Sequence, residues 1–364
     1  MIVMFLVGIV CLVLVHYASK DHFPYGLEWS FFILFFFAAI HYNFGNDYQS
    51  YMGIFDELNN RQFDWYYILR KKYFSDVGWA VICYLFRPVG FFPLIATIAL
   101  VENVAYYLLV KKFVPKEWWV LAVFIYLFSD NLYILNMSIL RQGLAASLFV
   151  FVFFLMKKFN VVNLLLGILI IFLISTIHGT AVILYPCLLL FFVKKEWAPY
   201  LTIPLVLLLV VLFVFPDYVN NFLLSIENLE EMAEYKKYYE RGEARSLSVG
   251  VIWRLLPFFV SGYYCIFSKD VNETDLKIVL LSMLGFVLIP FSLAIPMIDR
   301  LCYFFAPFMV ASIPITYKTL PSKYMHPLLF LQMAYFLYGY WQMFHSPTWM
   351  ESYYHFHSIF EVIF

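Results

Sequence analysis

The chain has 364 residues, of which 64% are hydrophobic and 13% charged, and its mean hydropathy is +0.80. This composition excludes an ordinary soluble domain and indicates an all-α polytopic membrane protein. The formal net charge of zero offers no basic surface for nucleic acid, and the five cysteines have no metal-ligand spacing, so we read them as small hydrophobic residues.

Apolar runs long enough to cross a bilayer predict about twelve transmembrane helices in a single integral membrane domain, 1–364. The first run lacks a basic n-region and a cleavage site, so we expect it to be retained as a span rather than removed as a signal peptide. The runs fall at 1–17, 29–42, 90–110, 118–134, 139–156, 161–177, 179–193, 198–215, 249–267, 276–296, 300–317 and 326–343.

Lysines recur in every second connection between these runs. By the positive-inside rule these connections are cytoplasmic, which places both termini outside. The lysines in question are Lys20, then Lys111, Lys112 and Lys116, then Lys157 and Lys158, then Lys194 and Lys195, then Lys269 and Lys277, then Lys318 and Lys323.

Two of the outer segments are long. The segment 43–89 mixes charged and aromatic residues and contains a short apolar stretch, Val77 to Phe86, which predicts an interfacial or re-entrant helix. The segment 217–248 is rich in charge and helix formers, which predicts a helix over the outer mouth of the protein.

Polar residues that are costly in a membrane gather at one predicted depth, near the outer face. Arg141 lies about one turn inside a span, where a charge costs roughly 2.5 to 3.5 kcal/mol. His178 and the pair Asp299-Arg300 also lie at outer ends of spans, and Asp47 belongs to the adjoining loop. This placement predicts an outward-facing polar cavity in which Arg141 meets an anion.

Structural explanations for the same residues stay open. Arg141 can serve a structural ion pair or snorkel from a helix end, and His178 can be a satisfied interfacial residue. Asp299 and Arg300 can neutralise each other at a helix start, and any outer loop could place an acid such as Asp47.

Five short motifs, spread from about residue 30 to 320, together resemble the EpsG family of polysaccharide-biosynthesis membrane proteins, which are Wzy-like polymerases. The family commonly has a glutamate and a tyrosine where this chain has Asp76 and Trp79, and often a small residue with a serine in place of Gly179-Thr180. The motifs are Gly45-x-Asp47-Tyr48-x-x-Tyr51, Asp76-x-Gly78-Trp79, Ile139-Leu140-Arg141-Gln142-x-Leu144-Ala145, His178-Gly179-Thr180-Ala181 and Arg300-x-x-Tyr303-Phe304.

The resemblance implies a membrane glycosyltransferase with a GT-C-like or Wzy-like architecture. It would transfer a growing glycan from undecaprenyl pyrophosphate to the non-reducing end of the next lipid-linked unit, on the outer face of the bacterial cytoplasmic membrane. Besides this lipid-linked oligosaccharide, its partners would be membrane lipids, and a chain-length regulator is left open.

The same resemblance suggests roles for individual residues. Arg141 and Arg300 would bind the diphosphate, which leaves no need for a metal or other cofactor, and Asp47 or His178 would be the general base. Asp299 would orient Arg300 or pair with it. The residues assigned to substrate binding are Tyr48, Tyr51, Gln142, Arg254, Asp299 and Tyr303.

Three other functions remain open at this point. A transporter or flippase of lipid-linked glycans would also use arginines in a hydrated cavity, although its polar residues would be expected at the midplane. A GT-C-type glycosyltransferase with a polyprenyl-phosphate sugar donor would use an outer-loop acid such as Asp47, and a membrane acyltransferase would use a buried histidine such as His178.

Overall fold

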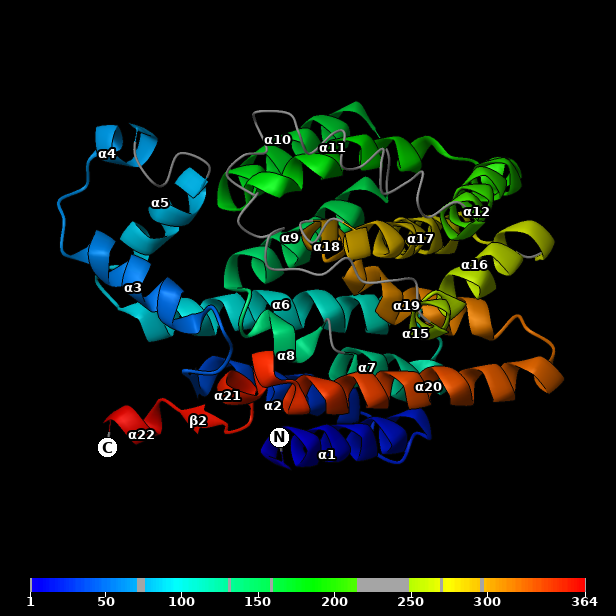
Figure 1. Cartoon of the computed structure of the whole chain (residues 1–364), viewed down its shortest axis with the longest axis horizontal. Helices are drawn as coiled ribbons and strands as arrows, with labels where there is room; N and C mark the ends of the chain where they lie inside the picture. Colours follow the sequence, from blue (N-terminus) through cyan, green and yellow to red (C-terminus); the bar gives the residue numbers. More distant parts are fainter. Residues whose placement is uncertain are drawn as a thin grey trace.

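The computed structural model describes residues 2–70, 76–129, 132–157, 160–214, 249–268, 271–294 and 298–363, and these residues are mostly helical (Figure 1). The helix predicted within 217–248 lies outside this part of the chain. The first half contains α1 (Ile2–Ser19), α2 (Gly26–Ile40), β1 (His41–Tyr42), α3 (Tyr48–Asn59), α4 (Trp65–Arg70), α5 (Val77–Phe86), α6 (Phe91–Phe113), η2 (Lys116–Trp118), α7 (Trp119–Phe128), α8 (Tyr133–Asn136), α9 (Leu140–Met156) and α10 (Val161–Ile177).

The second half continues the bundle and ends in a short tail. Its elements are η3 (Gly179–Ile183), α11 (Leu184–Cys187), η4 (Leu188–Phe192), η5 (Lys195–Trp197), α12 (Ala198–Val214), α15 (Val249–Arg254), α16 (Leu256–Phe267), α17 (Glu273–Ala294), α18 (Ile298–Cys302), α19 (Ala306–Tyr317), α20 (Ser322–His345), α21 (Pro347–Tyr353), β2 (His357–Ser358) and α22 (Phe360–Ile363).

The helices identify a membrane protein. In the described part of the chain, three helices are long and apolar enough to cross a bilayer, namely Ile2–Ser19, Phe91–Phe113 and Glu273–Ser292. Shorter apolar helices accompany them, including α2, α9, α10 and α19. The total of twelve spans stays a prediction.

Several predicted spans are interrupted, and proline explains two of the breaks. The run 249–267 divides into α15 and α16, and the run 300–317 into α18 and α19, with Pro257 and Pro307 in the first turns of α16 and α19. Proline lacks a backbone N–H and is best tolerated at a helix start. The run 118–134 divides into α7 and α8, and the run 179–193 forms η3, α11 and η4 instead of a continuous α-helix.

Small and polar residues let neighbouring helices approach closely. A Cβ atom on Gly26 would lie 2.2 Å from the carbonyl oxygen of Leu14, so only glycine fits where α2 crosses α1. The Ser30 hydroxyl donates to the carbonyl oxygen of Cys11 at 3.0 Å. Between α19 and α17, the Ser312 hydroxyl donates to the Ser282 hydroxyl at 2.7 Å. Such contacts hold helices together where lipid provides no hydrophobic driving force.

Several lysine-bearing connections lie near acidic residues of other connections. Lys111 at the end of α6 pairs with Glu28 at the start of α2 at 2.9 Å, and Lys116 pairs with Asp21. Asp275, at the start of α17, is within electrostatic range of Lys157 and Lys318. These contacts link connections that the lysine pattern assigns to one side of the membrane.

The opposite end carries α3, α4, α5 and the C-terminal tail (Figure 1). Strand β2 of the tail pairs antiparallel with β1, with His41 opposite Ser358. The backbone N–H of Gly45 also donates to the carbonyl oxygen of Ser352 at 3.0 Å. The described part of the segment 43–89 and the tail therefore share one end of the bundle, and the side of the membrane on which this end lies stays a prediction.

Candidate functional site

Arg141 lies in the first turn of α9, where it meets residues from two elements of the 43–89 segment. Its guanidinium donates to the carboxylate of Asp76, and the carbon of that guanidinium lies 5.4 Å from the ring centroid of Tyr51 on α3. Both side chains of the ion pair retain 23% exposure. The charge that the sequence leaves unexplained is therefore balanced, but it is not sealed from solvent.

Asp76 comes into reach because α5 packs on the end of α10. A Cβ atom on Gly78 would lie 2.3 Å from the hydroxyl oxygen of Thr176, so glycine is required for this approach. Trp79 is fully buried beside Tyr51, with ring centroids 5.5 Å apart. The motif Asp76-x-Gly78-Trp79 thus positions one carboxylate, one close contact and one packing residue.

Asp47 lies at the N-terminus of α3, in a turn that is docked on the segment before α9. Gly45 has φ +104°, a conformation that favours glycine, and its Cβ would lie 2.5 Å from the Cβ of Ser138. The backbone N–H of Asp47 donates to the hydroxyl of Ser138 at 3.3 Å. The Asp47 side chain remains exposed, which leaves it accessible to a substrate.

His178 follows α10 and is 9% exposed. Its Nδ1 lies 2.8 Å from the hydroxyl oxygen of Thr180, and its ring meets Phe304 edge to face at 5.9 Å between centroids. Thr180 fixes the ring from one side, and Phe304 follows α18, the helix that carries Arg300.

Arg300 is held through its backbone. The Gln142 side-chain amide donates to the Arg300 carbonyl oxygen, which ties α9 to α18. The Arg300 side chain is exposed, and within the described part of the chain it forms no ion pair.

The structure brings Arg141 and Arg300 within electrostatic range of both Asp47 and His178, and we call these four residues the charge cluster. The surrounding protein partly desolvates the Asp47 carboxyl group and raises its pKa although the residue stays accessible, and the positive charges of Arg300 and Arg141 partly offset that rise. Burial, with the same two arginines, lowers the pKa of His178 to about 3. The charge cluster therefore combines two guanidinium groups, a carboxyl group with a raised pKa and an imidazole that is uncharged at neutral pH.

Three of the predicted substrate-binding residues are buried and contact other side chains or the backbone of the protein. Tyr48 is fully buried, with ring contacts to His41 and Phe91 at 5.3 and 5.6 Å, so it packs inside the protein, and its assignment to substrate binding stays a prediction. Gln142 is also buried, and its side-chain amide holds the backbone of Arg300 in place. Tyr51 is nearly buried beneath Arg141 and positions the guanidinium.

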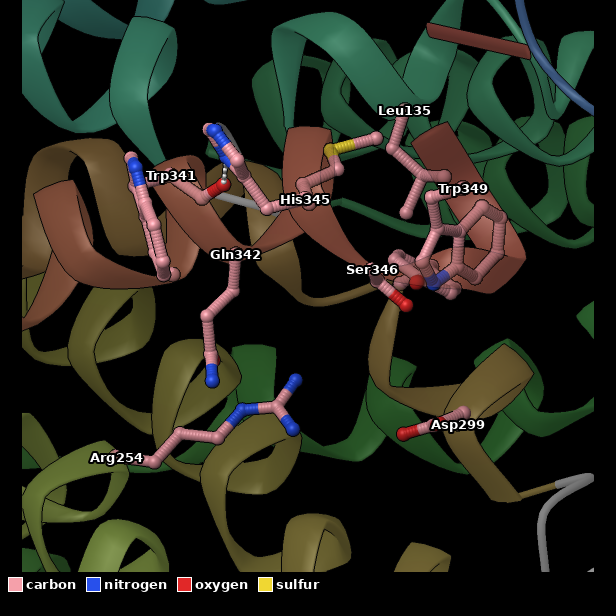
Figure 2. A pocket seen from close by; sticks show the side chains of 11 residues that line it. Leu135, Arg254, Asp299, Trp341, Gln342, His345, Ser346 and Trp349 are labelled. Atoms are coloured by element: carbon pink, nitrogen blue, oxygen red, sulfur yellow. Dashed lines mark hydrogen bonds between the residues drawn. The ribbon is translucent and has the colours of Figure 1, made fainter. Parts of the chain in front are cut away.

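The other three, Arg254, Asp299 and Tyr303, line a cavity of about 660 Å³ that we call the aromatic cavity (Figure 2). Helices α20 and α21 supply much of its remaining wall. The sequence predicts only a transmembrane span and an outer tail for this part of the chain, and no binding residues. The polar residues Gln342, His345 and Ser346, near the end of the apolar run 326–343, are the pattern in the sequence that indicates a site here. The wall residues from α20 and α21 include Trp341, Gln342, His345, Ser346 and Trp349.

Two short elements connect the aromatic cavity to the charge cluster. Helix α18 contributes Asp299 to the aromatic cavity and Arg300 to the charge cluster. Helix α21 contributes Trp349 to the cavity and ends at Tyr353, which is fully buried against Phe44 with ring centroids 5.1 Å apart. The two sites are therefore neighbours that share their supporting elements.

Comparison with known proteins gives one family match and no significant match to a curated protein or a solved structure. The EpsG family model matches residues 28–358, which contain every element of the charge cluster and of the aromatic cavity. Because the match covers nearly the whole chain, this protein belongs to the EpsG family.

Proposed function

We propose that this protein polymerises lipid-linked oligosaccharide repeat units on the outer face of the bacterial cytoplasmic membrane. Membership of the EpsG family supports a polysaccharide-polymerase type of role, and the apolar helices agree with a membrane enzyme. The observation that carries the detailed proposal is that Arg141 and Arg300, 159 positions apart in the chain, both act electrostatically on Asp47 and on His178.

In this proposal the arginines bind the diphosphate of undecaprenyl pyrophosphate. A guanidinium presents a planar fork of N–H donors that matches phosphate oxygens, and its charge stabilises the negative charge that develops on the leaving group. Arg300 is exposed and is suited to make the first contact. Arg141 is paired with Asp76 and held over Tyr51, so its position is fixed before substrate arrives.

Asp47 is the better candidate for the general base. Attack by the acceptor hydroxyl on the anomeric carbon of the donor sugar releases a proton, and the raised pKa of Asp47 strengthens this carboxylate as its acceptor. A pKa of about 3 makes His178 a weak base, because protonation beside two arginines is unfavourable. We assign His178 the role of a neutral hydrogen-bonding group.

The arginines also supply the countercharge that a divalent metal provides in many phosphoryl-binding sites. The proposed reaction therefore needs no metal in the charge cluster. The bond broken joins the anomeric carbon of the donor glycan to the diphosphate oxygen, the new glycosidic bond forms to the acceptor oxygen, and undecaprenyl pyrophosphate leaves.

The direct test is polymerisation by the purified protein in lipid nanodiscs, with lipid-linked repeat units as the only substrate and no transmembrane gradient. We expect products of two or more repeat units from the unaltered protein, and a large loss with Arg300→Gln. Arg87→Gln is the matched control, because Arg87 is an exposed arginine of the same end of the bundle, where it donates to the Arg61 carbonyl oxygen.

Failure of the unaltered protein to lengthen any glycan under these conditions would refute the polymerase proposal. Normal product length with Arg300→Gln would remove Arg300 from the diphosphate site. Normal product length with Arg141→Lys would do the same for Arg141, because lysine keeps the charge but lacks the bidentate fork.

One observation also favours a second candidate, a glycosyltransferase that uses a polyprenyl-phosphate sugar as donor. Asp47 is an exposed acid with a raised pKa on the first outer segment, and such an enzyme would need a base there. Transfer of a single sugar from a polyprenyl-phosphate donor, without transfer of whole repeat units, would select this candidate.

A further inference from the structure

We propose that the aromatic cavity binds uncharged, hydroxyl-rich sugar rings of the glycan that lie next to the reacting end. This inference rests on the proposed function and extends it by naming a second contact region for the same substrate. It assigns a role to the end of α20 and the start of α21, which the charge cluster does not use.

One wall of the cavity is an aromatic surface. On α20, Trp341 is 51% exposed and stacks with two rings of the same helix, Tyr338 and His345, at 6.2 and 4.3 Å between centroids and with planes 20° and 21° apart. The Nδ1 of His345 lies 2.8 Å from the Trp341 carbonyl oxygen, which orients this ring. Exposed, preorganised aromatic faces suit the C–H face of a pyranose ring, because such contacts bury apolar area and leave hydroxyl groups free at the ring edge.

Polar groups face each other across the same space (Figure 2). The Gln342 side chain points from α20 toward Arg254, and the Asp299 carboxylate lies on the side of Ser346. Gln342 itself is oriented by its amide, which donates to the Tyr338 hydroxyl at 2.8 Å. Amide, hydroxyl, guanidinium and carboxylate groups together can accept from and donate to sugar hydroxyls.

The charges in the cavity favour an uncharged ligand over an acidic one. Arg254 and Asp299 carry opposite charges and both line the cavity, so it has no cationic surplus of the kind that the charge cluster offers. A carboxylate such as Asp299 accepts hydrogen bonds from hydroxyl groups but repels an anion. The diphosphate therefore belongs to the charge cluster and the sugar hydroxyl groups to the aromatic cavity.

The size and place of the cavity fit this division. Its volume of about 660 Å³ lies within the range of about 300–1,000 Å³ that is typical of small-molecule sites. Asp299 in the cavity and Arg300 in the charge cluster are consecutive residues. A glycan that reacts at the charge cluster can therefore extend its neighbouring sugars into the cavity.

The test uses the soluble oligosaccharide that mild acid releases from lipid-linked units accumulated in cells lacking this protein. Saturation-transfer NMR measures its binding to the full-length protein in nanodiscs. We expect Trp341→Ala to weaken binding roughly tenfold, and a double variant with Gln342→Ala to weaken it further. In polymerisation of the intact lipid-linked units, the same variants should raise KM and leave kcat unchanged, since the charge cluster is untouched.

Trp197→Ala is the matched control, because Trp197 is also 51% exposed but lies on η5, away from the cavity lining. Equal binding by the Trp341→Ala and Trp197→Ala proteins would overturn the assignment of the cavity. Tighter binding by Asp299→Asn would overturn the uncharged ligand class, because it would show repulsion of an acidic sugar. In both cases continued polymerisation by the unaltered protein would leave the proposed function intact, whereas absence of accumulated lipid-linked units would refute both proposals.

Discussion

The ion pair between Arg141 and Asp76 provides the sharpest test of how the charge cluster is built. Replacing Asp76 by Asn keeps the shape of the side chain and removes its charge. The guanidinium of Arg141 then loses its ionic partner, and its remaining contacts there are with Tyr51 and with a neutral amide. We expect Arg141 to sample positions away from the charge cluster.

The exposure of the pair sets the size of the effect. Breaking a fully buried pair costs about 3–5 kcal/mol, and an exposed pair contributes about 0–1 kcal/mol. With 23% exposure on each side chain the pair lies between these limits, so we expect about 2 kcal/mol. If that free energy holds Arg141 in its active position, turnover falls roughly 30-fold.

The assay is initial-rate polymerisation in nanodiscs, with thermal unfolding of the same samples as the measure of stability. Asp56→Asn is the control, because Asp56 is an exposed acid on α3 for which the described residues provide no ion pair. Asp76→Glu should recover part of the activity by restoring the charge. Unaltered turnover in Asp76→Asn would refute the reasoning that this pair positions Arg141 for the reaction.

Three further predictions concern the turn that carries Asp47. First, activity should fall as the pH drops, since protonation of Asp47 at its raised pKa removes the base. Because Arg300 lowers that pKa, the residual activity of Arg300→Gln should show the midpoint of this fall at a higher pH. An unmoved midpoint would argue against Asp47 as the base. Second, Gly45→Ala should reduce both the thermal stability and the product length, because the positive φ and the contact with Ser138 cost about 1–3 kcal/mol. Gly53→Ala is the control and should leave both intact, because its Cβ would have nothing within 4 Å. Equal behaviour of the two variants would contradict the docking of this turn. Third, Tyr353→Ala should lower the free energy of unfolding by about 3–5 kcal/mol and shorten the product, because Tyr353 is fully buried against Phe44. Tyr354→Ala is the control and should do neither, because Tyr354 is 43% exposed. Full-length product from Tyr353→Ala would show that the tail does not support the turn.

The helical membrane architecture could be predicted from composition and apolar runs, because α1, α2, α6, α9 and α10 follow those runs within a few residues. A helix is also present at Val77–Phe86, and its interfacial or re-entrant placement stays a prediction. Interruptions were harder to predict, since a proline within an apolar run either starts a new helix, as Pro257 and Pro307 do, or lies inside a longer one, as Pro327 does in α20. Neighbouring helices decide between these outcomes, and the sequence does not show them.

The four residues of the charge cluster could be predicted because a charge or an imidazole at the end of an apolar run is costly without a partner. Their supporting residues could not. Tyr48 and Gln142 differ from substrate-contacting residues only in which way they face, and that depends on packing against Phe91 and on the position of the Arg300 backbone. The aromatic cavity was missed because its walls come from sequence-distant helices whose meeting no local pattern records.

The pairing of β1 with β2 joins residues 41–42 to residues 357–358. During translation β2 is made only after α3 to α21, so the turn between β1 and α3 lacks this lateral support until all the helices between the two strands have been made. Deletion of β2 should therefore leave the helices inserted but remove the support of the turn that carries Asp47, and a tag placed beside β2 would lie near the same turn. Labels for imaging or affinity capture belong on the lysine-bearing connections instead.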